Sequence, residues 1–365
     1  MTSLELGPPT SRARIRRLRE KLLGWYDTNH RDLPWRRSRD PYAIWISETM
    51  LQQTRVETVI PYYERFLARF PDIESLATAD RDDVYEHWAG LGYYSRARNL
   101  HNAAQMMVGD FEGRVPEQAE DLKKLPGVGR YTAGAVASIA YGQPEAVVDG
   151  NVIRVLTRLL DIRSDVAQKN VVERLWHEAG ALALGERPGD FNQALMELGA
   201  TVCTPRSPRC KPTCPLVRMC HSYAKGDVES LPNKPKNKKP RPVEAVAVWI
   251  PRRERILTVQ RPETGLLANL WELPGGELPP KAEAKDHVEQ IVRERVGLSL
   301  LSPTYAGTVE HVFTHLKMQL HLFRTAGAEG RVRNGGHQAH QWIAPDRFDD
   351  LPVSTLARKA FELLQ

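Results

Sequence analysis

The fold of the chain is predicted first from residues 122–155, LKKLPGVGRYTAGAVASIAYGQPEAVVDGNVIRV. The stretch predicts a helix, a glycine turn, a second helix and then a loop that carries one aspartate, Asp149. Gly127 and Gly129 lie two apart in the turn, so the backbone can take positive φ and leave its amides uncovered. Exposed amides ahead of a helix N-terminus suit a phosphate, although a plain helix–helix corner has the same local pattern.

The turn and the following loop are more specific than a generic corner. LPGVGRYTA at 125–133 resembles the helix-hairpin-helix of DNA base-excision glycosylases, and VDGNVIR at 148–154 resembles the segment that holds their essential aspartate. The resemblance implies a catalytic Asp149, with Tyr131 and Asn151 positioning the catalytic groups. It also implies DNA-backbone contacts at Gly127, Val128 and Gly129.

Length and charge limit the classes of protein that this chain can be. With 365 residues it can bury two ordinary cores, and length alone favours two domains. Lys and Arg number 51 against 45 Asp and Glu, a modest basic excess that suggests a polyanionic partner without proving one. Residues 12–29 have an amphipathic pattern that predicts a helix. Six of the cations crowd residues 12–21, where a solvated helix face is the alternative interpretation.

The sequence contains no membrane or secretion signal that we recognise. No stretch approaches the apolar length of a membrane span, and the first residues lack an apolar signal core. We therefore expect a cytoplasmic protein with no membrane partner.

One carboxylate, Glu48, is set in a largely apolar helical stripe. Asp40-Pro41 predicts the start of this helix, since a capping carboxylate precedes a proline at the first helical position. Burial disfavours a charged carboxylate and raises its pKa, which suits a general acid; pairing with an arginine is the alternative. SETMLQQT at 47–54 resembles the catalytic-glutamate helix of the adenine DNA glycosylases, which implies that Glu48 is the general acid.

The same resemblance implies substrate contacts on several other segments. RDLPWR at 31–36 borders the base pocket in that family, and Gln193 offers an amide to a purine edge. A tyrosine on the glycine-rich junction 90–94 can wedge into the base stack. A tight turn with packed rings at 90–94 and helix-surface polarity at Gln193 are the alternatives. The implied substrate-binding residues here are Arg31, Trp35 and Gln193, with Gln53 and Tyr93 as the wedge.

All four cysteines fall between residues 203 and 220, which in a reducing compartment favours a metal site over disulfides. Four thiolates in so short a segment suit a cubane iron-sulfur cluster, while ligand type alone leaves tetrahedral zinc open. The position resembles the [4Fe-4S] loop of the endonuclease III superfamily, although the gap filled by residues 211–213 is one residue longer than usual there. The implied ligands are Cys203, Cys210, Cys214 and Cys220.

Beyond a proline- and lysine-rich linker at 225–242, the periodicity changes to short β-type runs at 245–250 and 256–260. The segment LWELPGGE at 270–277 resembles the start of a Nudix fold. Ala282, Gln290-Ile291 and Arg295 stand where catalytic Nudix proteins carry metal-site residues, and only Glu294 remains. One carboxylate cannot assemble the magnesium site, so we expect a fold kept for binding.

A loop in this second half implies what that fold binds. HVFTH at 311–315 resembles the Phe-Ser-His loop with which the family reads 8-oxoguanine. The resemblance implies lesion contacts from Phe313, Thr314 and His315, and ordinary strand-end packing is the alternative.

Taken together, the resemblance to the adenine DNA glycosylase family covers residues 12 to 360 and implies a multidomain protein. We expect an all-α helix-hairpin-helix glycosylase domain at 8–224 with the [4Fe-4S] loop at 203–220, a linker at 225–242, and an α+β Nudix-like recognition domain at 243–365. The implied function is monofunctional removal, by a monomer, of adenine mispaired with 8-oxoguanine or guanine in double-stranded DNA. Glu48 would protonate the base and Asp149 would stabilise the oxocarbenium ion.

Three other functions remain as alternatives. A bifunctional endonuclease III-type lyase needs a lysine at the place of Tyr131. A Nudix pyrophosphatase needs the metal-binding glutamates that this chain lacks. A protein that only binds lesions would not need the Glu48 and Asp149 pair.

Overall fold

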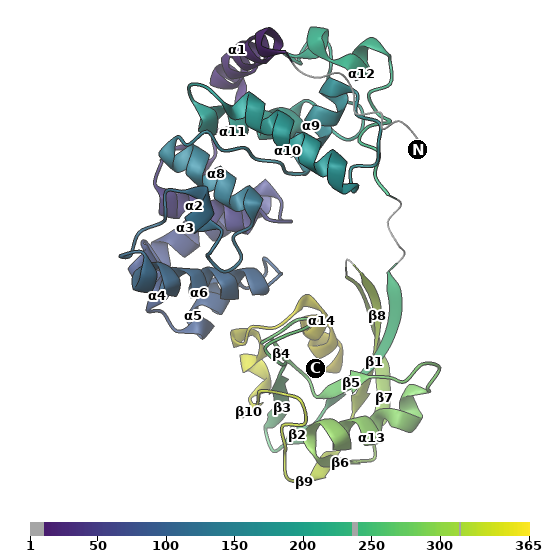
Figure 1. Cartoon of the computed structure of the whole chain (residues 1–365). Helices are drawn as coiled ribbons and strands as arrows, with labels where there is room; N and C mark the ends of the chain where they lie inside the picture. Colours follow the sequence, from purple (N-terminus) through teal and green to yellow (C-terminus); the bar gives the residue numbers. More distant parts are fainter. Residues whose placement is uncertain (1–10, 236–239, 314) are drawn as a thin grey trace. The chain divides into compact units, whose positions relative to one another are not determined.

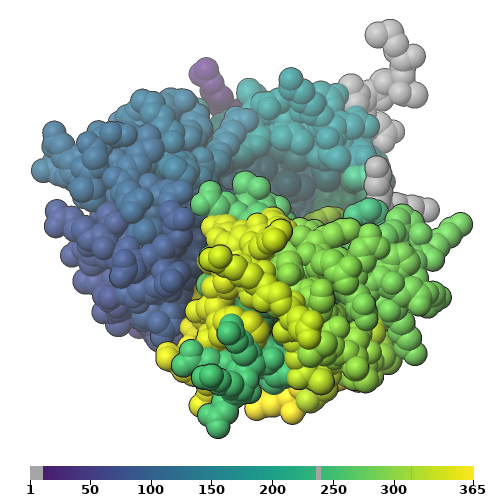
Figure 2. Space-filling view, turned by 90° about the horizontal axis from the view of Figure 1, so that it is seen from below, coloured from purple at the N-terminus to yellow at the C-terminus, as the bar shows by residue number. Residues whose placement is uncertain are grey.

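The computed structural model describes residues 11–235, 240–313 and 315–365. The chain forms two compact units, the first from residues 1–79 and 99–236 and the second from residues 80–98 and 237–365. Figure 1 shows the elements of each, and in Figure 2 the green-to-yellow residues of the second unit form one continuous body. Thr314, a predicted lesion contact, lies outside the described residues.

Helices build the first unit, and its described residues contain no strand. The first helix, α1, spans the range 12–29 that its amphipathic pattern predicts. α2 begins where Asp40-Pro41 predicts, because the Asp40 carboxylate accepts hydrogen bonds from the amides of Tyr42 and Ala43. The elements are α1 (Arg12–Asn29), η1 (Pro34–Arg36), α2 (Pro41–Leu51), α3 (Val56–Arg69), α4 (Ile73–Ala77), most of α6 (Ser95–Asp110), α7 (Ala119–Leu122), α8 (Arg130–Tyr141), α9 (Gly150–Leu160), α10 (Lys169–Ala183), α11 (Pro188–Thr201), η2 (Val217–Met219) and α12 (His221–Ala224).

The small-residue helix α8 packs against both α2 and α11. Its Gly134 is fully enclosed, and a Cβ there would lie 2.1 Å from the carbonyl oxygen of Ala146. The segment that leads to Asp149 can therefore cross α8 only because this residue is a glycine. A second close approach lies between α9 and α11, where a Cβ on Gly199 would lie 2.6 Å from the Cβ of Asn151. These contacts bring α2, α8, α11 and the start of α9 together.

The second unit is α+β. Its main sheet has the strand order β5-β1-β8-β7, in which β1 pairs with β8 in parallel and the other neighbours are antiparallel. The second sheet has the order β10-β3-β2, with β4 paired to β3, and β6 pairs with β9. The elements are α5 (Arg81–Trp88), β1 (Arg241–Trp249), β2 (Pro251–Arg252), β3 (Arg255–Gln260), β4 (Trp271–Glu272), β5 (Gly275–Glu277), α13 (Ala284–Val296), β6 (Leu298–Leu301), β7 (Thr304–Val312), β8 (Leu316–Arg324), β9 (Gly327–Gly330), β10 (Ala339–Ile343), η3 (Pro345–Asp350) and α14 (Thr355–Leu364).

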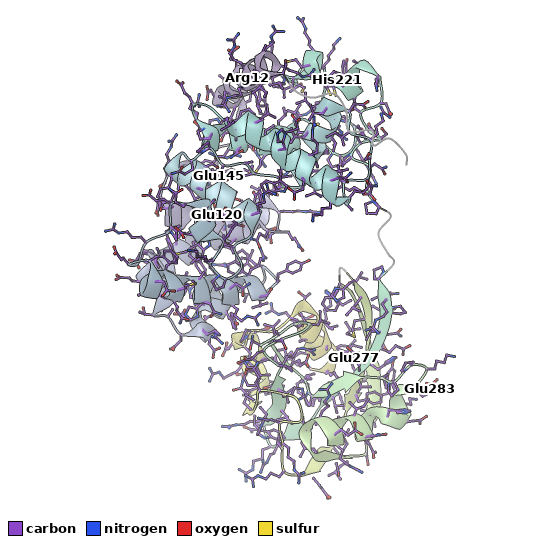
Figure 3. All side chains as sticks on the ribbon, viewed as in Figure 1. Arg12, Glu120, Glu145, His221, Glu277 and Glu283 are labelled. Carbon is purple, nitrogen blue, oxygen red and sulfur yellow. The ribbon has the colours of Figure 1, made fainter. Side chains whose placement is uncertain are left out.

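Alternation along β1 divides the second unit into two apolar cores. Val246 and Val248 pack with α13, whereas Ala245 and Ala247 belong to the cluster that includes α14. Phe348 and Phe361 stack at 4.1 Å between ring centroids in the α14 cluster. Glu277 and Glu283, labelled in Figure 3, mark the end of β5 and the N-cap of α13. The β-type runs predicted at 245–250 and 256–260 are confirmed as parts of β1 and β3.

None of the helices described here is long and apolar enough to cross a membrane.

The glycine at the α8 crossing generates a stability prediction. Gly134→Ala should lower the free energy of unfolding by at least about 2 kcal/mol, because the added methyl meets a backbone carbonyl that cannot move alone. The matched control is Gly180→Ala in α10, where a Cβ meets nothing within 4 Å and alanine favours the helix by about 1 kcal/mol. Urea unfolding followed by circular dichroism measures both. Equal midpoints for the two variants would contradict this account of the packing.

Candidate active site

A cavity of about 660 Å³ in the first unit collects most of the residues predicted to act on a substrate. It lies where η1, α2, the hairpin turn, α8, the start of α9 and α11 meet, and its size suits a small organic ligand. The predicted residues that line it are Arg31, Trp35, Glu48, Gln53, Gly127, Gly129, Tyr131, Asp149, Asn151 and Gln193.

Glu48 is a buried carboxyl group in the wall of this cavity. Its residue is 5% exposed, and burial raises its pKa to about 7. The Tyr131 hydroxyl, which donates to Oε2 at 2.8 Å, and the charge of Arg36 oppose the rise, while the charge of Asp149 adds to it. Glu48 therefore keeps its proton in a large share of molecules at neutral pH, as a general acid requires.

Asp149 caps α9 and faces the same cavity. Its Oδ1 accepts from the Val152 amide at 2.7 Å, and its Oδ2 accepts from the Asn151 side-chain amide at 2.9 Å. Burial raises the pKa of this carboxyl, and both hydrogen bonds oppose the rise. The two predicted catalytic acids thus lie on one cavity although they are far apart in the sequence.

A buried arginine that the sequence analysis missed holds Asn151 in place. Arg154 donates to the side-chain oxygen of Asn151 and to the Gly199 carbonyl, both at 2.7 Å. Its Nε also donates to the carbonyl of Cys203 at 2.7 Å, so a hydrogen-bond chain joins Asp149 to the cysteine loop. The signal in the sequence was a cation within the VDGNVIR motif, on the helix that Asp149 begins.

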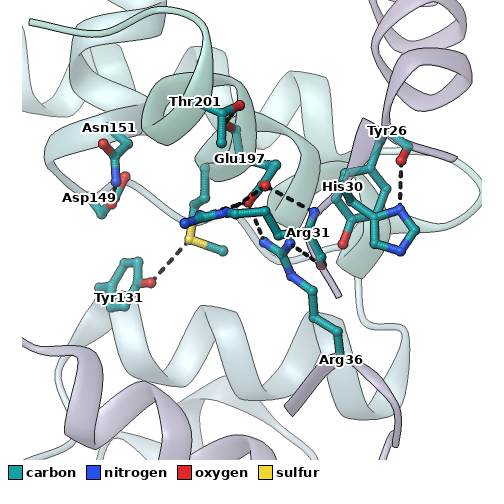
Figure 4. Close-up of polar contacts among 10 residues, drawn as sticks. Tyr26, His30, Arg31, Arg36, Tyr131, Asp149, Asn151, Glu197 and Thr201 are labelled. Carbon is teal, nitrogen blue, oxygen red and sulfur yellow. Dashed lines mark hydrogen bonds and ion pairs between the residues drawn. The ribbon is translucent and has the colours of Figure 1, made fainter. Parts of the chain in front are cut away.

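A second buried glutamate was also missed. Glu197 is fully buried and receives two hydrogen bonds from the Arg31 guanidinium, at 2.8 and 2.9 Å, and one from Arg36 at 2.8 Å (Figure 4). Burial alone would raise the pKa of Glu197, but these hydrogen bonds and charges outweigh it and lower the pKa to about 2. Arg31 therefore lines the cavity with its guanidinium paired to Glu197.

The hairpin turn takes positive φ at one of its two glycines. Gly127 has φ of +77°, whereas Gly129 has φ of −91° and is exposed at the N-cap of α8. Val128 differs from its neighbours, because its residue is buried and its amide donates to the Leu125 carbonyl at 3.1 Å. Of the three residues predicted to contact a DNA backbone, the two glycines are thus the exposed ones.

Several predicted contacts lie on exposed turns. Gln53 follows α2 with φ of +59°, and Tyr93 in the second unit has φ of +49° and is 50% exposed. Phe313 and His315 lie in the loop between β7 and β8, where the Phe313 ring contacts His311 edge-on at 4.5 Å. His315 is exposed, as a residue that reads a ligand must be.

The four cysteines are free thiols that gather in one loop of the first unit. Burial raises the pKa of Cys214 to about 12, and charges on the other three thiols add to that rise, so all four are near neighbours. Arg158, which is 1% exposed, donates to the carbonyls of Thr204 and Pro205 at 2.7 and 3.0 Å and fixes the start of the loop. Within the described residues, no three acidic, histidine or cysteine side chains could hold a single metal ion. Four thiolates are the donor set that holds an iron-sulfur cluster.

Comparison with known proteins identifies the family. The model of the HhH-GPD superfamily of base excision DNA repair proteins matches residues 46–180, and that of the NUDIX domain matches residues 245–363. The chain is 37% identical over 408 aligned positions to adenine DNA glycosylase of Mus musculus, covering 97% of this chain and 79% of that protein. This chain belongs to the adenine DNA glycosylases.

Other relatives of this adenine DNA glycosylase agree. The Homo sapiens adenine DNA glycosylase is 37% identical over 410 positions, covering 97% of this chain and 75% of that protein. A solved thermostable thymine-DNA glycosylase is 30% identical with a TM-score of 0.53, covering 60% of this chain and 100% of that chain. The predicted fold class, helix-hairpin-helix plus Nudix-like, and the predicted base-excision glycosylase activity are confirmed.

The ion pairs of Glu197 with Arg31 and Arg36 predict how the stability of the protein depends on pH. Folding lowers the pKa of Glu197 from 4.5 to about 2, so its stabilisation is present above about pH 4.5 and is lost as pH falls toward 2. At pH 6, Glu197→Gln should reduce the free energy of unfolding by about 3 kcal/mol, and the difference from the unsubstituted protein should narrow as pH falls to 3. Urea unfolding at several pH values measures it, with exposed Glu64→Gln as the control. A difference that does not change with pH would contradict the assignment.

Proposed function

We propose that this adenine DNA glycosylase removes adenine mispaired with 8-oxoguanine or guanine from double-stranded DNA and leaves an abasic site. The observation that carries the proposal is the buried Glu48, with a pKa of about 7, on the same cavity as Asp149. In most classes of glycoside hydrolase, two carboxyl groups flank the bond that is cleaved, one as an acid and one as a base or nucleophile.

Glu48 acts as the general acid. Adenine leaves poorly as an anion, so a proton must reach the base, at N7, as the bond between C1′ and N9 breaks. The cavity encloses Glu48 and keeps a large share of it protonated near neutral pH, while the Tyr131 hydroxyl fixes the orientation of its carboxyl group. The bonding electrons leave with the protonated base.

Asp149 stabilises the positive charge that develops on the sugar. Asn151 and the Val152 amide orient this carboxylate, and Arg154 holds Asn151 in turn. A fixed carboxylate beside C1′ favours the oxocarbenium ion electrostatically. Water then adds to C1′, and the proton that it loses returns to the Glu48 carboxylate, which restores the acid.

The enzyme is monofunctional in this proposal. A lyase would need an amine to form a Schiff base with the sugar, and the described residues that line the cavity include arginines but no lysine. Tyr131 stands at the position where the resembling lyases carry their lysine.

DNA binding by the first unit uses the exposed turns. The hairpin glycines Gly127 and Gly129 present their backbone to phosphate, with Val128 anchoring the turn in the core. Arg31, Trp35 and Gln193 line the cavity that receives the flipped base. Flipping costs a few kcal/mol, and the exposed side chain of Gln53 offsets part of this cost by entering the stack. Tyr93, exposed in the second unit, is the other candidate for this role.

The second unit recognises the base opposite adenine. Phe313 and His315, which lie between β7 and β8 of the main sheet, are the residues that read this base. The third reader in this proposal, Thr314, lies outside the described residues. The remaining glutamate of the Nudix segment, Glu294, accepts a hydrogen bond from Gln290 at 2.9 Å. A fold without its set of metal-binding carboxylates suits recognition better than hydrolysis.

Cys203, Cys210, Cys214 and Cys220 would hold a [4Fe-4S] cluster. When bound, the cluster would cross-link the loop at 203–220. Arg154 and Arg158 tie the first residues of this loop to α9, so the loop would support the helix that Asp149 begins.

The general-acid assignment predicts the behaviour of one variant. Glu48→Gln should reduce adenine release from a duplex with adenine opposite 8-oxoguanine by at least about a hundredfold, the lower end of what a general acid contributes. Binding of the same duplex should stay within about threefold, since the amide keeps the shape of the side chain. Single-turnover assays and gel-shift titrations measure the two effects, with exposed Glu74→Gln as the control. Persistent excision by Glu48→Gln would show that another group is the acid.

The reading loop predicts a change in discrimination. Replacing both Phe313 and His315 with alanine in the full chain should lower the preference for adenine opposite 8-oxoguanine over adenine opposite guanine by about tenfold or more, because each lost contact costs about 1 kcal/mol. Adenine release opposite guanine should change little. Glu283→Gln at the start of α13 serves as the control. An unchanged preference would exclude the loop as the reader.

A further inference from the structure

The hydroxyl group of Tyr131 lies between two acceptors. It is 2.8 Å from Glu48 Oε2 and 3.1 Å from the Met196 sulfur, and Figure 4 draws the sulfur contact. A phenol has one hydrogen to donate, and a thioether sulfur is a weak acceptor that donates nothing. Tyr131 can therefore satisfy one of these neighbours at a time, and Glu48 decides which.

Two arrangements follow from the protonation of Glu48. When Glu48 is a carboxylate, it outcompetes the sulfur and receives the Tyr131 hydrogen. When Oε2 of Glu48 carries the proton, that oxygen faces Tyr131 as a donor, and the Tyr131 hydrogen must then point elsewhere. The Met196 sulfur is the neighbour that can accept it.

We propose that Met196 is a positioning residue that accepts the Tyr131 hydrogen when Oε2 of Glu48 carries the proton, and that it thereby stabilises the protonated form of the general acid. The proposal rests on the proposed role of Glu48 as the acid. When the Oε2 hydrogen turns from Tyr131 to adenine and the O–H bond breaks, N7 takes the proton, the bonding electrons stay on Oε2, and the Tyr131 hydrogen rotates from sulfur to the new carboxylate. This hydrogen bond stabilises the charge as it forms, which is when stabilisation accelerates the reaction.

The other groups around Glu48 act on it in a different way from Tyr131 and Met196. Among the described residues, Tyr131 supplies the hydrogen bond to the Glu48 carboxyl group. Asp149, at the start of α9, and Arg36, in η1, act on Glu48 through charge. The Arg36 guanidinium is bonded to Glu197 and to the Arg31 carbonyl. Met196 lies one residue before Glu197 on α11, so the buried ion pairs that anchor α11 also fix the sulfur.

The test is the pH dependence of single-turnover adenine release by the full chain, between pH 5.5 and 9. Met196→Leu keeps the volume of the side chain but removes the acceptor, so Tyr131 donates to Glu48 at all times and favours its charged form. The pH above which the rate falls should therefore move down by about half a unit or more. Met196→Gln, whose side-chain oxygen accepts, should restore the profile.

A second background separates this role from packing. The Tyr131→Phe variant has no hydroxyl hydrogen for Met196 to accept. The double variant with Met196→Leu should therefore have the same pH profile as Tyr131→Phe alone. The same shift in both backgrounds, or a Met196→Leu profile that matches the unsubstituted protein, would overturn the inference. If the unsubstituted protein shows no fall in rate at high pH and Glu48→Gln stays active, the general-acid function itself fails, and the inference fails with it.

Discussion

The site depends on the burial of one carboxyl group. Glu48 lies in α2, where residues 42–50 are all buried. Burial disfavours the charged form of Glu48 more than the Tyr131 hydrogen bond and the charge of Arg36 favour it. This balance puts its pKa near neutrality, where a group can both hold and release a proton. The helix can be buried so deeply because α8, which packs against it, is rich in small residues that permit close approach. The packing of α2 against α8 therefore also raises the pKa of Glu48.

Two buried glutamates on the same cavity have opposite environments. Glu197 is as enclosed as Glu48, yet two arginines hold its pKa near 2. Glu48 accepts its side-chain hydrogen bond from a tyrosine and not from an arginine. Arg36 is bonded to Glu197 and acts on Glu48 through its charge. Groups whose environments push their pKa values apart carry separate roles. Glu197 keeps a fixed charge that organises the wall of the cavity, and Glu48 is the group that can change its charge there.

The sequence predicted the secondary structure and the candidate catalytic residues better than it predicted the residues that orient those candidates. Helical periodicity and the Asp40-Pro41 cap located α1 and α2, and an acid in an apolar stripe marked Glu48. Periodicity could not reveal Arg36, Arg154, Met196 and Glu197, because their partners lie up to 166 positions away in the chain. Glu197 has the same apolar helical surroundings as Glu48, and nothing local shows that one meets two arginines and the other a tyrosine. The resemblance supplied motif residues, whereas the residues that orient them depend on tertiary packing.

The most direct test is to titrate Glu48 itself. The carboxylic acid stretch of the free enzyme, measured by infrared difference spectroscopy from pH 5 to 9 with Glu48→Gln as the reference, reports the protonation of this one group. The band should disappear with an apparent pKa of about 7 if Glu48 is the acid. Loss of the band near pH 4.5, the ordinary value for a glutamate, would show that Glu48 is ionised at neutral pH and would contradict its role as the acid.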